Sequence, residues 1–421
     1  MARPVPRLAR YTLRHQWPAV LLEGATVGFV SLAPFVVKRS LGAGAAIVPL
    51  LITIWQTSWI FAPAVAPVLA RHDPQRSWRR IALLSHLPLL LVGLVWVEPT
   101  GSGGSGTGNL ALFLCALSLY YGAGVASLTH RGALLRANYA PEVRGRLWGL
   151  LQTVTILATV AAAKTGGWLL DHDPRTLRVI FPCAAVLGYV GFFRLGRIRW
   201  RRQRRALLGA SGGDGPLRAI LGAMRETVRI LREDKAFRTF QIAFMLYGFA
   251  FLMSWALLVL LAEESLRLSY SDWTWAQGFA FPLSQIAGMA LFGRIYDRIG
   301  VVRTTALSYG MLFVFLLWVP HVAGATDLAF AYALFGMSMS GVNLGWGLGP
   351  PHFAPEGKAH IYTAAHLSCV GFRSLFAPFL GYGLEALFST KVAFAVAAAL
   401  MALGAATMLR AWHSPHRSHA S

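Results

Sequence analysis

The stretch that decides the fold is residues 281–320, FPLSQIAGMALFGRIYDRIGVVRTTALSYGMLFVFLLWVP. It joins two apolar runs, which belong to the predicted segments 273–293 and 304–322, through a short turn that holds all of its charged residues. A helix needs about 20 apolar residues to cross the hydrocarbon core of a bilayer. Each run is therefore long enough for one crossing, and the charged turn between them marks where the chain leaves the membrane.

Apolar segments of similar length recur along the whole chain, in two groups of six. The first group is 19–38, 45–70, 80–98, 109–130, 146–168 and 177–196, and the second is 239–262, 273–293, 304–322, 328–350, 361–384 and 392–410. The chain of 421 residues is 56% hydrophobic and only 13% charged, whereas a soluble domain has about 25% charged residues. We therefore predict an all-α membrane protein with twelve transmembrane helices. Residues 1–196 and 239–421 would each form a six-helix bundle, separated by a linker at 197–238.

The basic residues lie between the apolar segments. The formal net charge is +22, but the arginines do not gather on one soluble face, which argues against nucleic-acid binding. Lys and Arg concentrate in alternate loops, and such loops face the cytoplasm. We therefore expect both termini to be cytoplasmic, in a bacterial cytoplasmic (inner) membrane. The three cysteines lie inside apolar segments and predict no disulfide framework.

The linker 197–238 is strongly basic. It opens with several arginines, and after Pro216 its apolar residues recur at helical spacing from Leu217 to Leu231, with arginines largely on other faces. A basic amphipathic helix lying on anionic lipid headgroups fits this pattern. A solvated tether that orients the two halves fits it equally well.

The two halves of the sequence resemble each other. The stretch NYAPEVRGRLWG from Asn138 aligns with HFAPEGKAHIYT from His352, and the same offset places Gly167 on Gly381 without a gap. This alignment matches the fifth helix to the eleventh, as expected for a duplication of six helices.

The turn GRIYDRIGVVR carries the motif that identifies a family. It resembles the cytoplasmic signature of the major facilitator superfamily, through Gly293, Asp297, Arg298, Gly300 and Arg303. The resemblance implies two six-helix bundles around a midplane cavity, transport by alternating access, and a latch in which the acid caps a neighbouring helix and pairs with arginine.

The first half departs from this pattern. Its corresponding loop, ARHDPQRSWRR, keeps Asp73 and basic residues but lacks the glycines. The family's antiporter signature in the fifth helix is also broken, because Lys164 stands where proline is expected. The direction of transport therefore does not follow from the resemblance.

Arg373 is the strongest candidate for contact with cargo. It lies about 13 residues into the eleventh helix, or roughly 20 Å, near mid-membrane, where an ionisable group normally faces a cavity or a partner. It shares one face with Thr363 and His366. The repeat maps His366 on Gln152 and Arg373 on Thr159, so the facing stripe of the fifth helix is also polar, and these residues are further candidates for lining the cavity. Our hypothesis is that Arg373 binds an anionic group of the substrate or a gating carboxylate. The alternative is a structural arginine that is hydrogen-bonded to carbonyls.

Three other residues are candidates for transport. Glu23 lies near the inner end of the first helix, at a depth closer to His366 than to Arg373. A buried carboxylate or a histidine can exchange protons near neutral pH, so proton coupling through Glu23 and His366 is a hypothesis. Asn343 is a candidate substrate contact, because the tenth helix lines the cavity in the family.

The sequence thus predicts a secondary-active transporter, a symporter or antiporter, that moves a small solute by alternating access. It predicts no catalytic constellation, metal site or cofactor. It also predicts that the protein is a monomer. Two alternatives stay open: a transport-inactive relative that acts as a sensor or assembly partner, and a lipid flippase.

Overall fold

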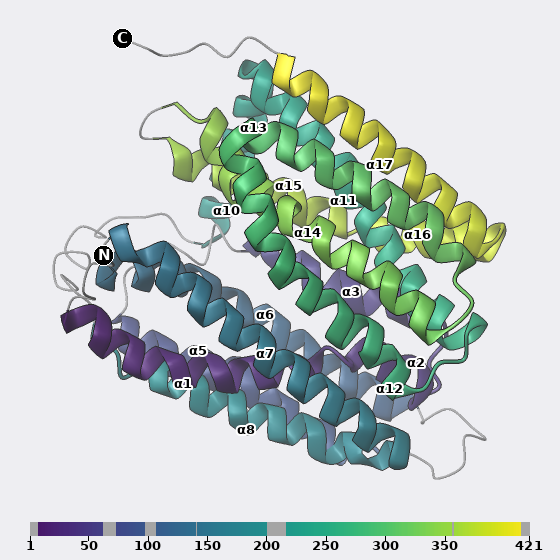
Figure 1. Cartoon of the computed structure of the whole chain (residues 1–421). Helices are drawn as coiled ribbons and strands as arrows, with labels where there is room; N and C mark the ends of the chain where they lie inside the picture. The colour runs from purple at the N-terminus through teal and green to yellow at the C-terminus, as the bar shows by residue number, and fades with distance from the viewer. Residues whose placement is uncertain are drawn as a thin grey trace. The chain divides into compact units, whose positions relative to one another are not determined.

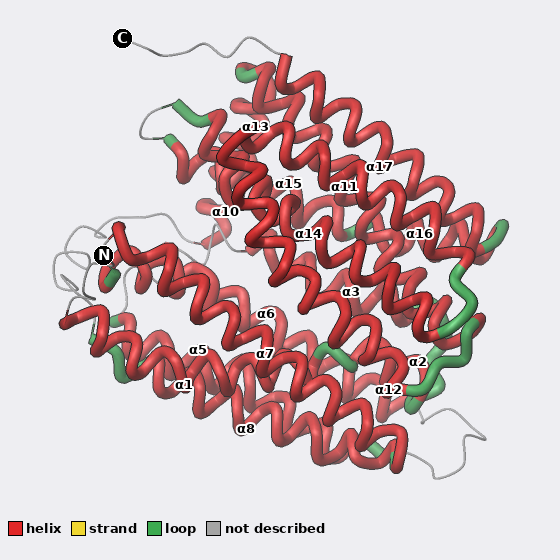
Figure 2. Tube along the Cα trace, in the orientation of Figure 1, coloured by secondary structure: helices red, strands yellow, loops and turns green. Residues whose placement is uncertain are grey.

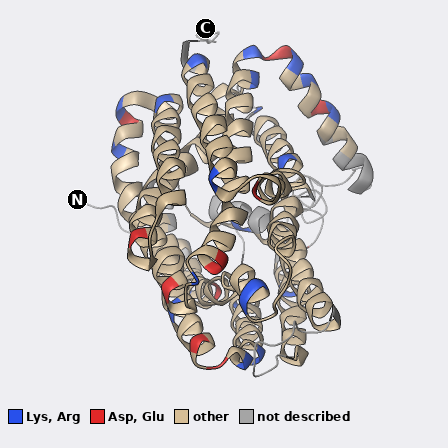
Figure 3. Ribbon diagram, turned by 90° about the vertical axis from the view of Figure 1, so that its right-hand side faces the viewer, with Lys and Arg blue, Asp and Glu red and all other residues tan. Residues whose placement is uncertain are grey.

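The structure is a computed structural model that describes residues 7–61, 73–96, 107–139, 141–199, 216–355 and 358–413. In these ranges the chain forms helices joined by loops, without a strand (Figure 2). Nine of the described segments are long and apolar enough to cross a membrane. Figure 3 shows Lys and Arg mainly near helix ends, with long uncharged stretches between them.

The nine segments correspond to more than nine crossings. Tyr270–His321 spans 52 residues, more than twice the roughly 20 that one crossing needs, and Gly300 interrupts it with φ 76° and ψ 172°. The shorter apolar helix Ile47–Ile60 and the helical stretch from Pro74 to Leu94 supply two more. The predicted twelve-helix layout is confirmed.

Contacts divide the chain into two units. Unit 1 comprises residues 1–43 and 61–219. Its helices are α1 (Arg7–Val30), α2 (Ala33–Arg39), α5 (Pro74–His86), η2 (Leu87–Leu94), α6 (Thr107–Asn138), α7 (Pro141–His172), η3 (Pro174–Thr176) and α8 (Leu177–Leu195). Helix α1 packs against α7 and α8, and α5 packs against α6 and α8 (Figure 1).

Unit 2 comprises residues 44–60 and 220–421. Its elements are α3 (Ile47–Thr57), η1 (Ser58–Phe61), α10 (Pro216–Glu233), α11 (Lys235–Leu260), η4 (Leu261–Ser265), α12 (Tyr270–Trp275), η5 (Ala276–Ala280), α13 (Phe281–Trp318), η6 (Val319–His321), α14 (Ala325–Phe353), α15 (Ala359–Ser374), α16 (Ala377–Leu387) and α17 (Thr390–His413), the first residues of α10 and the last residue of η1 lying in unit 1. Helix α11 packs against α15, α16 and α17, and α13 packs against α14 and α17. This order of contacts parallels that of unit 1, as the internal repeat requires.

Residues 44–60 pack within unit 2, although they precede most of unit 1 in the sequence. Trp55 meets the ring of Trp255 edge-on at 5.8 Å between centroids, and Trp59 meets Trp346 at 5.9 Å. Helix α3 thereby lies against α11, α15 and α16. The predicted division of the chain at 197–238 stays a prediction.

Polar side chains fix where several helices begin. Asp73 precedes α5 and accepts a hydrogen bond from the amide of Gln75. Asp234 precedes α11 and accepts one from the amide of Phe237 at 2.9 Å. Such caps satisfy amides that have no partner inside the helix, and they set the register in which the spans place their polar residues.

Candidate functional site

The first element of the site in unit 1 is the close approach of α1 to α7. A Cβ atom on Gly24 would lie 2.3 Å from the carbonyl oxygen of Thr155, and one on Gly28 would lie 2.3 Å from that of Thr159. Only glycine permits this spacing, as is common where helices pack in membranes. The Thr159 hydroxyl then donates to the carbonyl of Gly24 across the contact, at 3.0 Å.

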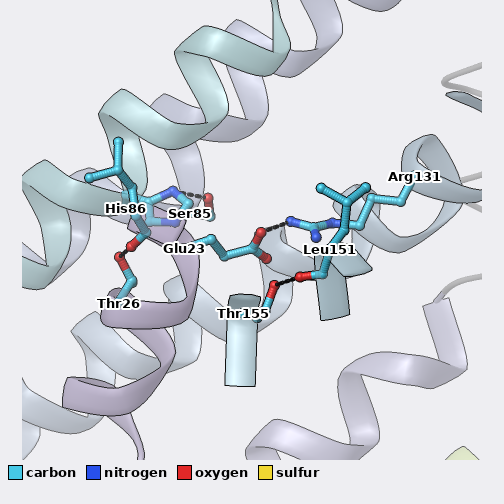
Figure 4. A network of polar contacts seen from close by, with 8 residues as sticks. Glu23, Thr26, Ser85, His86, Arg131, Leu151 and Thr155 are labelled. Carbon is cyan, nitrogen blue, oxygen red and sulfur yellow. Dashed lines mark hydrogen bonds and ion pairs between the residues drawn. The ribbon is translucent and has the colours of Figure 1, made fainter. Parts of the chain in front are cut away.

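Glu23, next to this contact, forms an ion pair. Its carboxylate meets the guanidinium of Arg131 on α6 (Figure 4). The Glu23 side chain is 15% exposed and that of Arg131 is 12% exposed. Two opposite charges in this largely buried setting attract each other much more strongly than in water.

Aromatic and imidazole rings surround the pair. The guanidinium carbon of Arg131 lies 5.6 Å from the ring centroid of Phe192. The His86 ring meets Phe192 at 4.5 Å and Tyr120 at 5.7 Å between centroids, and its Nδ1 is hydrogen-bonded to Ser85 (Figure 4). A Cβ on Gly188 would collide with the imidazole, so that glycine makes the room for His86.

Arg373 lies in unit 2, one residue before the end of α15. Its Nη1 donates to the carbonyl of Phe244 on α11 at 2.6 Å. Its guanidinium carbon lies 5.6 Å from the ring centroid of Tyr247 and 5.8 Å from that of Phe244. A Cβ on Gly248 would come within 1.7 Å of that carbon, so the side chain fills a notch in α11.

The charge of Arg373 has no counter-ion in the described part of the chain. The residue is 2% exposed, and its Nε is buried without a hydrogen-bond acceptor among the described residues. The carbonyl and the aromatic rings offset part of the cost of burial. A full negative charge close to the guanidinium is what this environment lacks.

The eleventh helix is interrupted directly after Arg373. Helix α15 ends at Ser374, and α16 begins at Ala377, followed by Pro378. Proline fits the first turn of a helix because it lacks an amide hydrogen that would need a partner. The predicted single segment 361–384 is therefore two shorter helices, with Arg373 beside the break.

His366 lies two helical turns before Arg373. Its Nδ1 is hydrogen-bonded to Oε1 of Gln241 on α11 at 2.9 Å. The rings of Phe244 and Trp346 enclose the imidazole, at 4.6 and 5.1 Å between centroids. His366 is fully buried, and its Nε2 has no partner among the described residues.

The other predicted cavity residues are divided between the units. Gln152 and Thr159 are half-buried on α7 in unit 1. Asn343 is exposed on α14 in unit 2. The roles predicted for these residues stay predictions.

The motif residues lie around the interruption in α13. The backbone turns at Gly300, whose positive φ suits glycine, and Gly293 and Arg303 flank the turn on either side. Asp297 and Arg298 are exposed, and within the described ranges neither makes an ion pair. In unit 1, Asp73 caps α5 and lies 3.9 Å from Arg76. The latch role predicted for these residues stays a prediction.

Two residues of these sites were missed by the sequence reasoning. Arg131 follows the fourth apolar segment directly and reads as a flanking charge, although α6 continues to Asn138. Gln241 lies in the first turns of a strongly apolar span. Both residues could have been identified from an ionisable or amide side chain that lies in the first turns of an apolar span or in the helical turns that directly follow one.

Comparisons with known proteins agree with this architecture. A sequence profile described as Major Facilitator Superfamily matches residues 16–372. No curated protein sequence matches the chain. Among solved structures, the nucleoside transporter NupG is similar with a TM-score of 0.71 at 10% identity, covering 95% of this chain and 100% of that one.

Two further structures are similar at low identity. The inward-open xylose transporter XylE from E. coli has a TM-score of 0.66 at 13% identity, with 98% of both chains covered. The human organic anion transporter MFSD10 has a TM-score of 0.66 at 13% identity, covering 96% of this chain and 100% of that one. At these identities the likeness shows the fold, whereas the profile covers most of the chain. The chain therefore belongs to the Major Facilitator Superfamily, a family of membrane transporters.

Proposed function

We propose that the protein is a secondary-active transporter that moves a small solute by alternating access, and that Glu23 carries a coupling proton. The single observation that supports this is the ion pair between Glu23 on α1 and Arg131 on α6. Glu23 lies inside the candidate span Ala9–Arg39, and Arg131 lies four residues beyond the span Gly108–Ser127 on the same helix. An ionisable residue inside a span, such as Glu23, usually serves an ion or substrate pathway.

The pair couples protonation to conformation through its charge balance. A proton on Glu23 neutralises the carboxylate and leaves Arg131 buried without its counter-ion, which is strongly unfavourable. A conformation that hydrates Arg131, or gives it another partner, then gains population. Loss of the proton restores the pair and the original state.

Arg373 supports a second element of the proposal, an anionic group on the cargo. Its guanidinium is buried against a carbonyl and aromatic rings, without a carboxylate among the described residues. A carboxylate, phosphate or sulfonate on the cargo would supply the missing charge with charge-assisted hydrogen bonds. His366, whose Nε2 is unpaired among the described residues, stays a candidate for cargo contact or for the proton pathway.

The proton role is tested in liposomes with purified protein. A thermal-shift screen of metabolites, on wild type and on Arg373→Gln, first identifies a cargo. Its uptake is then measured with and without a pH gradient. Glu23→Gln should retain exchange of cargo across the membrane but lose accumulation driven by the gradient.

The matched control is Glu264→Gln, which makes the same chemical change at an exposed carboxylate in unit 2. Full gradient dependence in Glu23→Gln overturns the proton role. A cargo that stabilises wild type and Arg373→Gln equally overturns the anion role. A purified protein that moves none of the solutes that stabilise it supports the sensor alternative instead.

A further inference from the structure

Helix α10 lies outside the membrane-spanning segments and yet exposes large apolar side chains. Leu221, Met224 and Val228 are 46%, 50% and 47% exposed. Their spacing of three and four residues puts them in one stripe along the helix. Since α10 is not one of the candidate spans, lipid around a transmembrane helix does not account for this stripe.

A row of arginines runs beside the stripe. Arg225, Arg229 and Arg232 are exposed. Together with Met224, Val228 and one carboxylate, that of Glu233, they line a groove of about 520 Å³. Arg229 pairs with Glu226. Within the described residues, none of the ion pairs involves Arg225 or Arg232.

The position of α10 along the chain places it at the membrane surface. It ends at Glu233, and the span Lys235–Ser265 begins two residues later. The guanidinium of Arg238, in the first turn of that span, donates to the carbonyls of Leu231 and Arg232 at 3.2 and 3.4 Å. The last turn of α10 is therefore fixed to the end of a transmembrane helix.

We propose that α10 is an interfacial helix that docks on anionic phospholipid headgroups. The arginine row contacts phosphate oxygens, while the apolar stripe enters the boundary between headgroups and acyl chains. This combination of an apolar face and a basic row is what binds helices to anionic bilayer surfaces. A lipid surface fits better than a protein partner, because the adjoining span brings lipid next to the stripe.

Docking of α10 also acts on the eleventh helix. Asp234, between α10 and α11, accepts a hydrogen bond from the Tyr362 hydroxyl at 2.9 Å. Tyr362 lies in the first turn of α15, the helix that carries His366 and Arg373. The lipid-bound helix is thus connected, through one carboxylate, to the inner end of a helix in the proposed transport site.

The proposal is tested on the full chain with Cys115, Cys183 and Cys369 replaced by alanine. A bimane label is attached to a single cysteine introduced by Met224→Cys on the stripe, or by Gly222→Cys about 200° around the helix. Each protein is reconstituted into phosphatidylcholine alone or mixed with phosphatidylglycerol, with doxyl-labelled lipid as quencher. The label at position 224 should be quenched more than that at 222, and more strongly with phosphatidylglycerol.

Removing charge should weaken the docking in proportion. With the substitutions Arg225→Gln, Arg229→Gln and Arg232→Gln, the ratio of inserted to free helix should fall about fivefold for each arginine removed. In the chain that keeps all three arginines, added salt should weaken docking by screening their charges. The matched control removes three exposed cations elsewhere, through Arg175→Gln, Arg267→Gln and Lys391→Gln, and should leave the quenching unchanged.

Two results would overturn the proposal. One is equal quenching at position 224 in both lipid mixtures. The other is a label at position 224 that is buried at high protein density but becomes exposed when the protein is diluted in lipid. That result would show that the stripe packs against a second copy of the chain. The salt titration of the chain with its native arginines keeps the test valid if the triple variant does not fold.

Discussion

The same contact between helices is built with different chemistry in the two units. In unit 1 the Thr159 hydroxyl bridges α7 to the carbonyl of Gly24 on α1. The repeat maps Thr159 on Arg373, and in unit 2 Arg373 bridges α15 to the carbonyl of Phe244 on α11. A short neutral group and a long charged one thus occupy equivalent places.

The charges differ accordingly. Unit 1 balances a buried charge within itself, through Glu23 and Arg131. In unit 2, Arg373 is buried against a carbonyl and aromatic rings, without an ion-pair partner among the described residues. A duplicated scaffold has therefore kept its packing and diverged in its electrostatics. In the proposed function, the balanced charges of unit 1 would carry the proton and the unbalanced charge of unit 2 would bind the anion.

The largest expected effect breaks the charge balance of unit 1. Arg131→Gln leaves Glu23 buried without its partner, which should cost about 3 kcal/mol of stability. Adding Glu23→Gln should recover much of that loss, since two amides can hydrogen-bond to each other. Thermal unfolding in detergent measures both variants. Arg373→Gln should cost less stability, because no described residue of opposite charge would lose its ion-pair partner. A greater loss in Arg373→Gln than in Arg131→Gln would contradict the comparison.

The second effect concerns the glycines that make the two contacts possible. Gly248→Ala places a Cβ against the Arg373 guanidinium, and overpacking of this kind costs about 1–3 kcal/mol. Arg373→Thr should relieve the clash, because it gives unit 2 the side chain that unit 1 has.

The corresponding change in unit 1 is Gly28→Ala, in which the obstacle is the backbone carbonyl of Thr159. No change at the Thr159 side chain should rescue it. Unfolding temperatures of the two single and two double variants decide the matter, and rescue of Gly28→Ala by Thr159→Ala would show that the two contacts are not built as described.

A third difference lies where the repeat aligns Tyr139 with Phe353. Tyr139 donates to Oε1 of Gln16 at 2.7 Å in unit 1, whereas its repeat partner Phe353 packs on Phe237 and Phe240. Tyr139→Phe should cost about 1–2 kcal/mol, because Gln16 stays buried without that donor.

The pH dependence of this contact has a definite sign. Burial raises the pKa of the Tyr139 phenol above its ordinary value of about 10, so folding favours the neutral form. The contribution of the neutral phenol to the stability of the fold is complete below the ordinary pKa, and it is lost as the pH rises toward the raised pKa of the folded state. In alkaline buffer, the wild type should lose stability more steeply with pH than Tyr139→Phe. Parallel curves of stability against pH for the two proteins would contradict the hydrogen bond between Tyr139 and Gln16.

The smallest effect is expected at Thr159 itself. Its hydroxyl is shared between the carbonyls of Gly24 and Thr155, so Thr159→Val should cost only about 0.5–1 kcal/mol. A loss as large as that of Arg131→Gln, in the same unfolding assay, would mean that the contact between α1 and α7 depends on this one hydrogen bond.

Much of the fold could be read from the sequence. Length and hydropathy identify the spans, and the charged residues and the glycine predict the turn at Gly300. The repeat from Asn138 to His352 correctly placed Thr159 and Arg373 at equivalent contacts. These are local signals, each carried by neighbouring residues.

The partners of the buried charges could not be read in the same way. Which helix meets Glu23 depends on tertiary packing, and Arg131 resembled a residue at a membrane surface because α6 continues past its apolar part. The aromatic surroundings of Arg373 come from two helices far apart in sequence. The break after Ser374 differs in this respect, because Pro378 in the sequence already suggests a local bend at this point of the segment.

That break gives the eleventh helix the mechanics of two rods in series. Because no continuous ladder of backbone hydrogen bonds crosses from α15 to α16, a tilt of α15 need not move α16 with it. Helix α16 is held separately, where Gly381 lies against the backbone of Met253. Movement that begins at Tyr362, in the first turn of α15, can therefore shift the Arg373 guanidinium at the joint while α16 stays in place.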